Sequence, residues 1–160
     1  MTASADLVDL PSAPAGAKVT LRVATAADVD RIVRLAADIP ASPPAEVAAV
    51  SCAVRDGHAV VAVEDGGLVG ACWASALAAD VLAGGGLLVI AGRRGVGIGR
   101  WLVDYFHVTC PPRFALTLVC DSDLDGRAGE PVAARFWYRA GYQLLEATGP
   151  TRVFACTRHR

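Results

Sequence analysis

The part of the sequence with the clearest chemical potential is RRGVGIGRWLVDYF, residues 93–106, in which glycines alternate with other residues ahead of an apolar run. Glycine has no Cβ atom, so this backbone can approach a ligand closely. The apolar run predicts a helix over residues 97–109, and the first turn of a helix presents unpaired N–H groups and partial positive charge. The segment therefore predicts a site for a pyrophosphate, to which Arg94 and Arg100 add side-chain charge.

Two familiar glycine-rich nucleotide loops do not fit residues 93–106. The spacing is not the G-x-G-x-x-G of a dinucleotide-binding turn, and no Lys-Ser or Lys-Thr pair follows the glycines as in a P-loop. A plain flexible turn before a helix is the remaining alternative, but it would need one such glycine rather than three. The phosphate-binding interpretation is therefore preferred, with a ligand of another class.

The elements that would position this loop alternate between the hydrophobic periods of strands and helices. Strands are expected at residues 18–24, 59–63, 68–77, 84–91, 114–120, 142–147 and 152–158, and helices at residues 25–39, 46–54, 97–109 and 130–140. Thr25 is expected to cap the first helix, and EDGG at residues 64–67 predicts a tight hairpin turn. This order predicts a mixed α/β sheet covered by helices.

Composition limits the classes of function that the chain can serve. The 160 residues are 54% hydrophobic and 19% charged, with a net charge of −1, so no general attraction for nucleic acid or anionic membranes is expected. No apolar run reaches the length of a membrane span. Residues 1–17 predict a flexible N-terminal tail and residues 18–160 a single domain. Since the N-terminus carries Asp6 and Asp9 and no basic segment, no signal peptide is expected and the location is predicted to be cytoplasmic.

The five cysteines do not form a recognisable framework. Cys52, Cys72, Cys110, Cys120 and Cys156 are odd in number, lie far apart and include no C-x-x-C pair, and the histidines are not clustered. We therefore expect no disulfide and no metal site, and we expect the thiols to be reduced and mostly buried.

Several stretches of the chain together resemble the GNAT superfamily of N-acetyltransferases. They are the R-x-x-G-x-G loop at Arg94, Gly97 and Gly99, and the segments LRVATAADVDRIVRL, EDGGLVGACW and ARFWYRAGY. The resemblance extends over about residues 19–157. It implies an α/β (α+β) fold with a mixed, mostly antiparallel sheet of about six to seven strands. About four helices would flank the sheet, which would be splayed between its fourth and fifth strands.

By this resemblance the cofactor is acetyl-coenzyme A, and its parts meet defined segments of the chain. Pantetheine would pair with the strand backbone at Leu87, Leu88 and Val89, and the Val89 N–H is the candidate donor to the thioester carbonyl. One such donor is typically worth about 3 to 4 kcal/mol to an acyl transfer. The pyrophosphate would be held by the backbone of the loop, at Gly95, Val96, Gly97, Ile98, Gly99 and Arg100.

The residues for proton transfer depart from the family pattern. Acyl transfer from a thioester to an amine needs a neutral nucleophile and a proton for the leaving thiolate. Asp121, directly after the expected fifth strand, is the best-placed candidate base, and the alternative is a solvated loop acid. The signature tyrosine position holds Trp137, which would pack against coenzyme A, and the signature asparagine position holds Glu130. Tyr138, about 100° further round the helix, is the candidate acid, and the alternative is a surface packing residue.

Other polar side chains have simpler interpretations. His58 is expected to be a turn residue, and His107 a partly exposed helical residue. Cys120 could carry an acyl group, but no basic partner is adjacent in sequence. The acidic run at residues 121–125 either attracts a cationic acceptor or is a solvated loop.

The resemblance implies an enzyme that moves an acetyl group from acetyl-coenzyme A to a primary amine by direct attack in a ternary complex. The acceptor would be a small molecule, an amino acid derivative or a peptide, entering against residues 39–47 and the final hairpin. That hairpin could also join two chains as a homodimer. A non-catalytic coenzyme A binding module is the alternative that Trp137 favours, and a nucleotide-binding regulator is the third interpretation.

Overall fold

Seven strands form one mixed sheet in the computed structural model, which describes residues 18–39, 45–110, 114–120, 132–148 and 151–157. The strands are β1 (Val19–Val23), β2 (Ala59–Glu64), β3 (Gly67–Ala78), β4 (Val81–Val89), β5 (Phe114–Cys120), β6 (Gln143–Thr148) and β7 (Thr151–Thr157). Their order in the sheet is β1-β2-β3-β4-β5-β7-β6, so the last strand lies between β5 and β6. All neighbours are antiparallel except β4 and β5. The expected tail at residues 1–17 lies outside the described residues.

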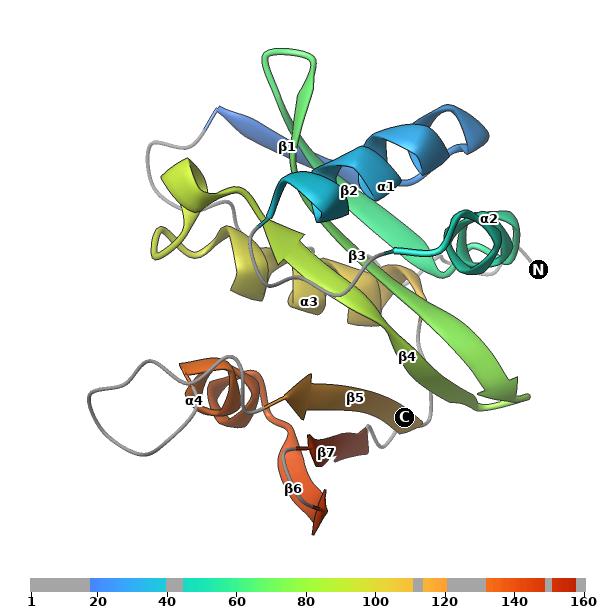
Figure 1. Ribbon diagram of the computed structural model, residues 1–160, viewed down its shortest axis with the longest axis vertical. Coiled ribbons are helices and arrows are strands. Elements are labelled where there is room, and N and C mark those ends of the chain that lie inside the picture. The colour runs from blue at the N-terminus through green and yellow to red at the C-terminus, as the bar shows by residue number, and fades with distance from the viewer. Residues whose placement is uncertain (1–17, 40–44, 111–113, 121–131, 149–150, 158–160) are drawn as a thin grey trace, which may run out of the picture.

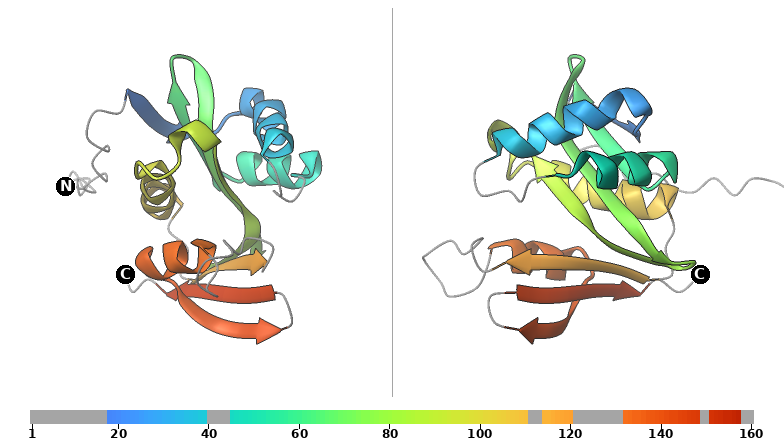
Figure 2. Two further views of the ribbon diagram at one scale, coloured as in Figure 1. Left: turned by 60° about the vertical axis from the view of Figure 1, so that its left-hand side comes forward. Right: turned by 45° about the vertical axis from the view of Figure 1, so that its right-hand side comes forward.

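Among the described residues, four α-helices cover this sheet. They are α1 (Val29–Asp38), α2 (Val47–Arg55), α3 (Ile98–Thr109) and α4 (Val132–Arg139). Figure 1 shows α1 and α2 on one face of the β1–β4 half, and Figure 2 shows α3 on the opposite face, with α4 on the same side as α3 beside β5–β7. None of these helices is long and apolar enough to cross a bilayer. The α/β (α+β) class predicted from the sequence is confirmed.

The hydrophobic core consists of three clusters that follow these layers. Ile32 and Val50 pack between the sheet and the α1–α2 layer, and Leu102 packs between the sheet and α3. Phe154 of β7 centres a third cluster under α4. The central strand β2 is buried on both faces, which explains why AVVAV reads as a continuous apolar run rather than an alternating one.

The β4 and β5 strands pair over a short length and then separate. Only Val81–Ala83 pair with Phe114–Leu116. The separation begins at Gly84 and Gly85, whose φ angles are +68° and +90°. Between the ladder pairs on either side, β4 holds these two residues opposite Ala74 alone, which is a β-bulge. The predicted splay between the fourth and fifth strands is confirmed, although β4 begins at Val81 rather than at residue 84.

The start of α1 is fixed by a buried carboxylate. Thr25 caps a short 3-10 turn, Ala26–Asp28, as expected from the sequence, and its N–H donates to Asp28 Oδ2 at 2.9 Å. The Arg22 guanidinium donates to both carboxylate oxygens of Asp28, at 2.6 and 2.9 Å. Asp28 is 1% exposed. The Arg22 hydrogen bonds, aided by Thr25, hold the pKa of the Asp28 carboxyl well below its usual range despite the cost of burial.

Asp28→Asn is expected to lower the free energy of unfolding by about 1 to 2 kcal/mol near neutral pH, because charge-assisted bonds become neutral ones and water partly screens Arg22. The folded-state pKa lies below that of the unfolded chain, near about 4, so the stabilisation is complete above that pH. It is lost as the pH falls through the lowered pKa of the folded state. The gap between wild type and variant, measured by urea unfolding, should therefore be smaller near about pH 3 than at neutral pH.

Asp56→Asn is the matched control for Asp28→Asn. Asp56 forms an ion pair with Arg55 at 3.0 Å on an exposed surface. Exposed ion pairs contribute little to stability, so Asp56→Asn is expected to leave the free energy of unfolding without a measurable change. Equal losses in the two variants, or a gap independent of pH, would contradict the role assigned to the Asp28 carboxylate.

Candidate functional site

The open side of β4 presents backbone groups where β5 has moved away. Ile90 N–H donates to a β3 carbonyl, that of Val69, at 3.0 Å. Because alternate residues of an antiparallel strand bond to the same neighbour, Leu88 also directs its backbone groups to β3, whereas Leu87 and Val89 direct theirs to the open side. Two of the three β4 residues expected to pair with pantetheine therefore have backbone groups at the opening.

The loop from β4 to α3 presents its backbone to solvent. It passes through a 3-10 turn, Ala91–Arg93, and residues 91–97 are all exposed. Gly95 and Gly97 have φ angles of +80° and +95°, in the left-handed region that favours glycine. Gly97 caps α3 without a side-chain hydrogen bond. Since Trp101 N–H makes the bond to Gly97 C=O at 3.0 Å, the preceding amides of the first turn have no partner within the helix.

Arg93 and Arg94 flank this loop in different electrostatic settings. Arg93 Nε pairs with Glu64 at 2.7 Å, and the carboxylate raises the pKa of the guanidinium. Arg94 Nε donates to the Val89 carbonyl at 2.9 Å. Within the described part of the chain, the partner of Arg94 is thus a neutral carbonyl rather than a carboxylate. Its positive charge remains available to an anion on the loop.

Arg100 ties α3 to the end of α4. Its Nε pairs with Asp104 one turn along the helix at 2.8 Å, and its Nη1 donates to the Arg139 carbonyl. A cation on the last carbonyls of a helix also complements the helix dipole. The structure therefore gives Arg100 a structural contact beside its predicted role in phosphate binding, which stays a prediction.

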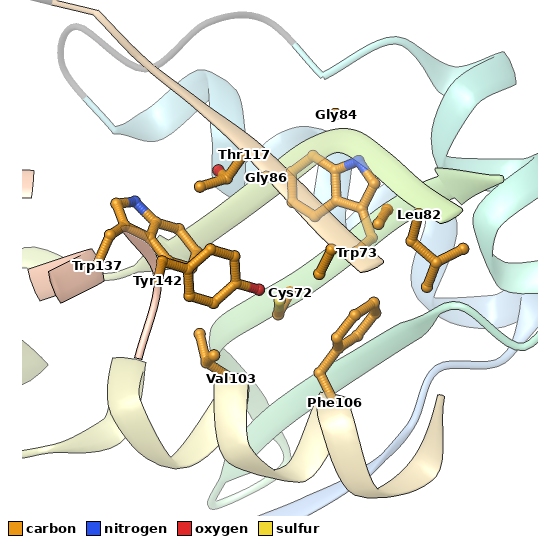
Figure 3. Close-up of a pocket in the computed structure, with 12 residues that line it drawn as sticks. Cys72, Trp73, Leu82, Gly84, Gly86, Val103, Phe106, Thr117, Trp137 and Tyr142 are labelled. Atoms are coloured by element: carbon orange, nitrogen blue, oxygen red, sulfur yellow. The ribbon is translucent and has the colours of Figure 1, made fainter. Parts of the chain in front are cut away.

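A small cavity of about 30 Å³ lies where β4 and β5 separate (Figure 3). The residues that line it include Cys72, Trp73 and Gly86 of the sheet, Phe106 of α3, and Trp137 and Tyr142 on the α4 side. The Trp73 ring lies over Gly86, where an added Cβ atom would come within 2.4 Å of it. A cavity of this size holds a water molecule or a group of similar size. It therefore marks a small, mostly apolar end of the opening between β4 and β5.

The structure separates the two aromatic residues predicted on the last helix. Trp137 is 9% exposed, lines the cavity and meets the Tyr142 ring edge-on at a centroid distance of 4.7 Å. Tyr138 is 48% exposed and packs on Phe154 at 5.2 Å. Tyr138 is not among the residues that line the cavity. The position of Trp137 fits its predicted contact with a ligand, whereas Tyr138 is not brought to the same place.

The remaining predicted polar residues contribute little to this geometry. Asp121 and Glu130 lie outside the described residues, as does the side chain of Cys120, so the candidate base stays a prediction. His58 occupies the turn between α2 and β2, as expected, and its N–H donates to the Ala53 carbonyl at 2.7 Å.

The sequence analysis missed a buried pair, His107 and Tyr142. His107 is 3% exposed, so the expectation of a partly exposed residue was wrong. Its Nε2 lies 2.9 Å from the Tyr142 hydroxyl, which comes from the segment after α4. The missed signal is helical spacing, because His107 follows Val103 by one turn on the face that packs inward. The pairing itself joins residues 35 positions apart and needs the fold to be seen.

The thiol of Cys72, which lines the cavity, is unreactive. Burial raises the pKa of Cys72 to about 12. The thiolate is the nucleophilic form of cysteine, so this side chain serves as a small apolar lining residue.

No protein-family model matches the chain, and no curated protein sequence matches it. Its likeness to known proteins lies in three-dimensional structure. An acetyltransferase of the GNAT family from Bacillus cereus aligns with a TM-score of 0.67 at 16% identity, over 89% of this chain and 99% of that one. The chain has the GNAT fold.

Two further structures with the GNAT fold contain ligands. Naa50 from Arabidopsis thaliana, in complex with the bisubstrate analogue CoA-Ac-MVNAL, aligns with a TM-score of 0.67 at 16% identity, over 89% of this chain and 100% of that one. Diaminobutyrate acetyltransferase EctA from Paenibacillus lautus was solved in complex with L-2,4-diaminobutyric acid and coenzyme A. It aligns with a TM-score of 0.65 at 17% identity, over 89% of this chain and 96% of that one. The GNAT resemblance of the sequence is confirmed at the level of the fold.

Proposed function

We propose that this chain is an acetyl-coenzyme A dependent N-acetyltransferase acting on the primary amine of a small molecule or peptide. One observation carries the proposal: the open backbone edge of β4 continues directly into the exposed glycine loop at the N-terminus of α3. The ligands of the similar structures support it, because Naa50 was solved with a coenzyme A–peptide analogue and EctA with coenzyme A and a diamino acid.

The described residues fit acetyl-coenzyme A at three places. The backbone groups of Leu87 and the N–H of Val89 would pair with the amides of pantetheine, as an added strand would, while the Val89 carbonyl accepts from Arg94. The loop amides between Gly95 and Arg100, with the charge of Arg94, would hold the pyrophosphate. The cavity beside Trp73 and Trp137 would receive the small acyl end. When bound, acetyl-coenzyme A supplies an activated thioester.

The chain contributes to the reaction mainly by holding two reactants in one place. A fixed donor and acceptor gain effective molarities that can reach about 10⁵ M or more, so positioning supplies much of the rate. The cavity has room for one small group, so an acyl end that fills it would leave no space for water beside it, which would limit hydrolysis. An amine that enters from the open side would meet the acyl group at the point where β4 and β5 separate.

The test of the proposed function is formation of coenzyme A from acetyl-coenzyme A with a panel of primary amines and peptides. The product should be separated by chromatography rather than detected with a thiol reagent, because Cys52 is exposed and would react. We expect turnover that depends on at least one amine. Tight binding of coenzyme A by calorimetry without turnover on any amine would replace the proposal with a coenzyme A binding module. No binding and no turnover would refute both.

A further inference from the structure

The Trp73 ring forms one wall of the cavity between β4 and β5. Trp73 lies opposite Gly86 in the β3–β4 ladder, so the side-chain positions of both residues are on the same face of the sheet. A Cβ atom at Gly86 would lie 2.4, 2.7 and 3.0 Å from the indole atoms Cη2, Cζ2 and Cζ3. These atoms belong to the outer, six-membered ring, which Figure 3 shows beside Gly86. Gly86 therefore makes room for an indole that extends from β3 across β4.

Packing holds the Trp73 ring in this position. Trp73 is 7% exposed and belongs to the core cluster between the sheet and the α1–α2 layer, together with Val50 and Leu88. Because protein interiors are close-packed, the ring cannot swing aside without displacing these neighbours. Val103 and Phe106 of α3 line the cavity from the opposite face of the sheet, and both are buried. The cavity therefore lies between two packed layers that cannot easily separate.

The paired part of β4 and β5 closes one end of the cavity. Leu82 lies opposite Ala115 in this short ladder, and both residues line the cavity. Opening the ladder to admit a longer group would leave buried backbone groups unpaired, which is costly. Since the cavity measures about 30 Å³, it accepts a group the size of one water molecule, and a methyl group is of similar size. Each further methylene group would have to displace a wall.

The proposed path of acetyl-coenzyme A brings its acyl end to the Trp73 ring. The pyrophosphate would lie on the loop at residues 95–100, and pantetheine would follow β4 past Val89 and Leu87. The next residue along β4 is Gly86, over which the Trp73 ring lies. The acyl end would therefore meet the indole directly beyond the segment that pairs with pantetheine.

We propose that Trp73 restricts the transferred acyl group to acetyl by limiting the length of the cavity, an inference that rests on the proposed acetyltransferase function. The methyl group of acetyl fits the cavity, whereas a butyryl chain meets the indole, α3 or the paired strands. Among these walls the outer ring of Trp73 is the one that can be shortened, because only the backbone of Gly86 lies beneath it. No side chain at residue 86 can refill the space. The identity of residue 73 therefore sets the length of the acyl chain.

The kinetic test compares acetyl-coenzyme A and butyryl-coenzyme A as donors to one accepted amine. For wild type we expect kcat/KM to be about 100-fold lower with butyryl-coenzyme A, since one methylene group in a closed pocket is worth about 10-fold or more. Trp73→Phe removes the outer ring and is expected to narrow this ratio to about 10-fold or less. Trp101→Phe removes the same ring from a residue that is not among the described residues lining the cavity, so the ratio should remain as in wild type.

Phe106→Leu tests the opposite wall, and melting temperatures of all variants are measured alongside. Trp73→Leu serves as the test if Trp73→Phe does not fold. The inference is overturned if an active wild type uses both donors equally well. It is also overturned if Phe106→Leu narrows the ratio and the shortened Trp73 side chain does not. In both cases the proposed function stands, whereas a wild type that is inactive with every donor and amine would refute the proposed function itself.

A binding measurement tests the size limit independently of activity. The probes are S-ethyl- and S-butyl-coenzyme A, thioethers that have no acyl group to transfer and do not react with the exposed Cys52. By calorimetry, wild type is expected to bind the butyl probe at least about 10-fold more weakly than the ethyl probe, and Trp73→Phe to bind both within about threefold. Equal affinities in wild type would mean that the chain lies outside the cavity and would overturn the inference. Failure to bind either probe or coenzyme A would instead count against the proposed function.

Discussion

Val96→Glu is expected to weaken coenzyme A binding about 100-fold, which corresponds to about 2.8 kcal/mol. Val96 is 54% exposed between Gly95 and Gly97, so the new carboxylate would lie among the amides proposed to hold the pyrophosphate. Two charges about 4 Å apart near a protein surface repel by about 4 kcal/mol before salt screening, enough for this loss. Calorimetric titration with coenzyme A would measure it, and the loss should shrink as the salt concentration rises.

Two matched variants show whether charge on the loop is the cause. Val96→Gln has the shape of the glutamate without its charge and is expected to bind within about threefold of wild type. Val47→Glu makes the same exchange at a residue that is 53% exposed at the start of α2, on the other face of the sheet, and should not alter affinity. If Val96→Glu binds normally, the phosphate does not lie on this loop and the proposed function loses its main support.

The parts of the fold that follow local rules could be predicted from the sequence. The turn at Asp65 and Gly66 is one, because both residues adopt positive φ angles, 49° and 78°, that asparagine, aspartate and glycine tolerate best. The cap at Thr25 is another, since it needs only neighbours within the next turn. The position of β7 between β5 and β6 could not be predicted in this way, because strand order depends on packing between distant segments.

The start of β4 was predicted at the wrong residue, although the glycines that mark its unusual backbone were noticed in the sequence. The three glycines at 84–86 mark a segment of unusual backbone, and the sequence analysis placed a strand start there. The structure places them inside β4, where two of them form the bulge that separates β4 from β5. Glycine inside a strand commonly marks a bulge or a close approach of backbones, and both apply here.

The candidate site also has a part that local sequence rules predict and a part that depends on contacts between distant segments. The loop at residues 93–100 was predictable because exposed amides at a helix N-terminus are a local feature. The His107–Tyr142 pair was not, because its two residues come from α3 and the segment after α4 and meet only in the folded core. The resemblance to the family signature directed attention to Tyr138, one residue after the signature position, which instead packs on Phe154.

Gly85→Ala is expected to destabilise the protein by about 3 kcal/mol or more and to lower its melting temperature by about 6 to 12 °C. A Cβ atom at Gly85 would lie 2.0 Å from the Trp73 carbonyl oxygen, and the φ of +90° is itself unfavourable for alanine. The obstacle is backbone in the middle of the β3–β4 ladder, so it cannot be relieved by rotating a side chain. Thermal and urea unfolding would measure the loss.

Gly84→Ala measures the conformational cost of a positive φ angle without the steric contact, so the difference between the two variants gives the steric part of the Gly85→Ala effect. Gly84 has a comparable φ of +68°, but a Cβ atom there would meet nothing within 4 Å. Its expected loss is therefore the conformational cost alone, about 1 kcal/mol, which leaves about 2 kcal/mol for the contact with β3 at Gly85. Equal losses in the two variants would mean that β4 can shift away from Trp73 without losing stability. In that case the bulge would not fix the separation of β4 and β5. The shape of the cavity where these strands separate would then be determined by the helices instead.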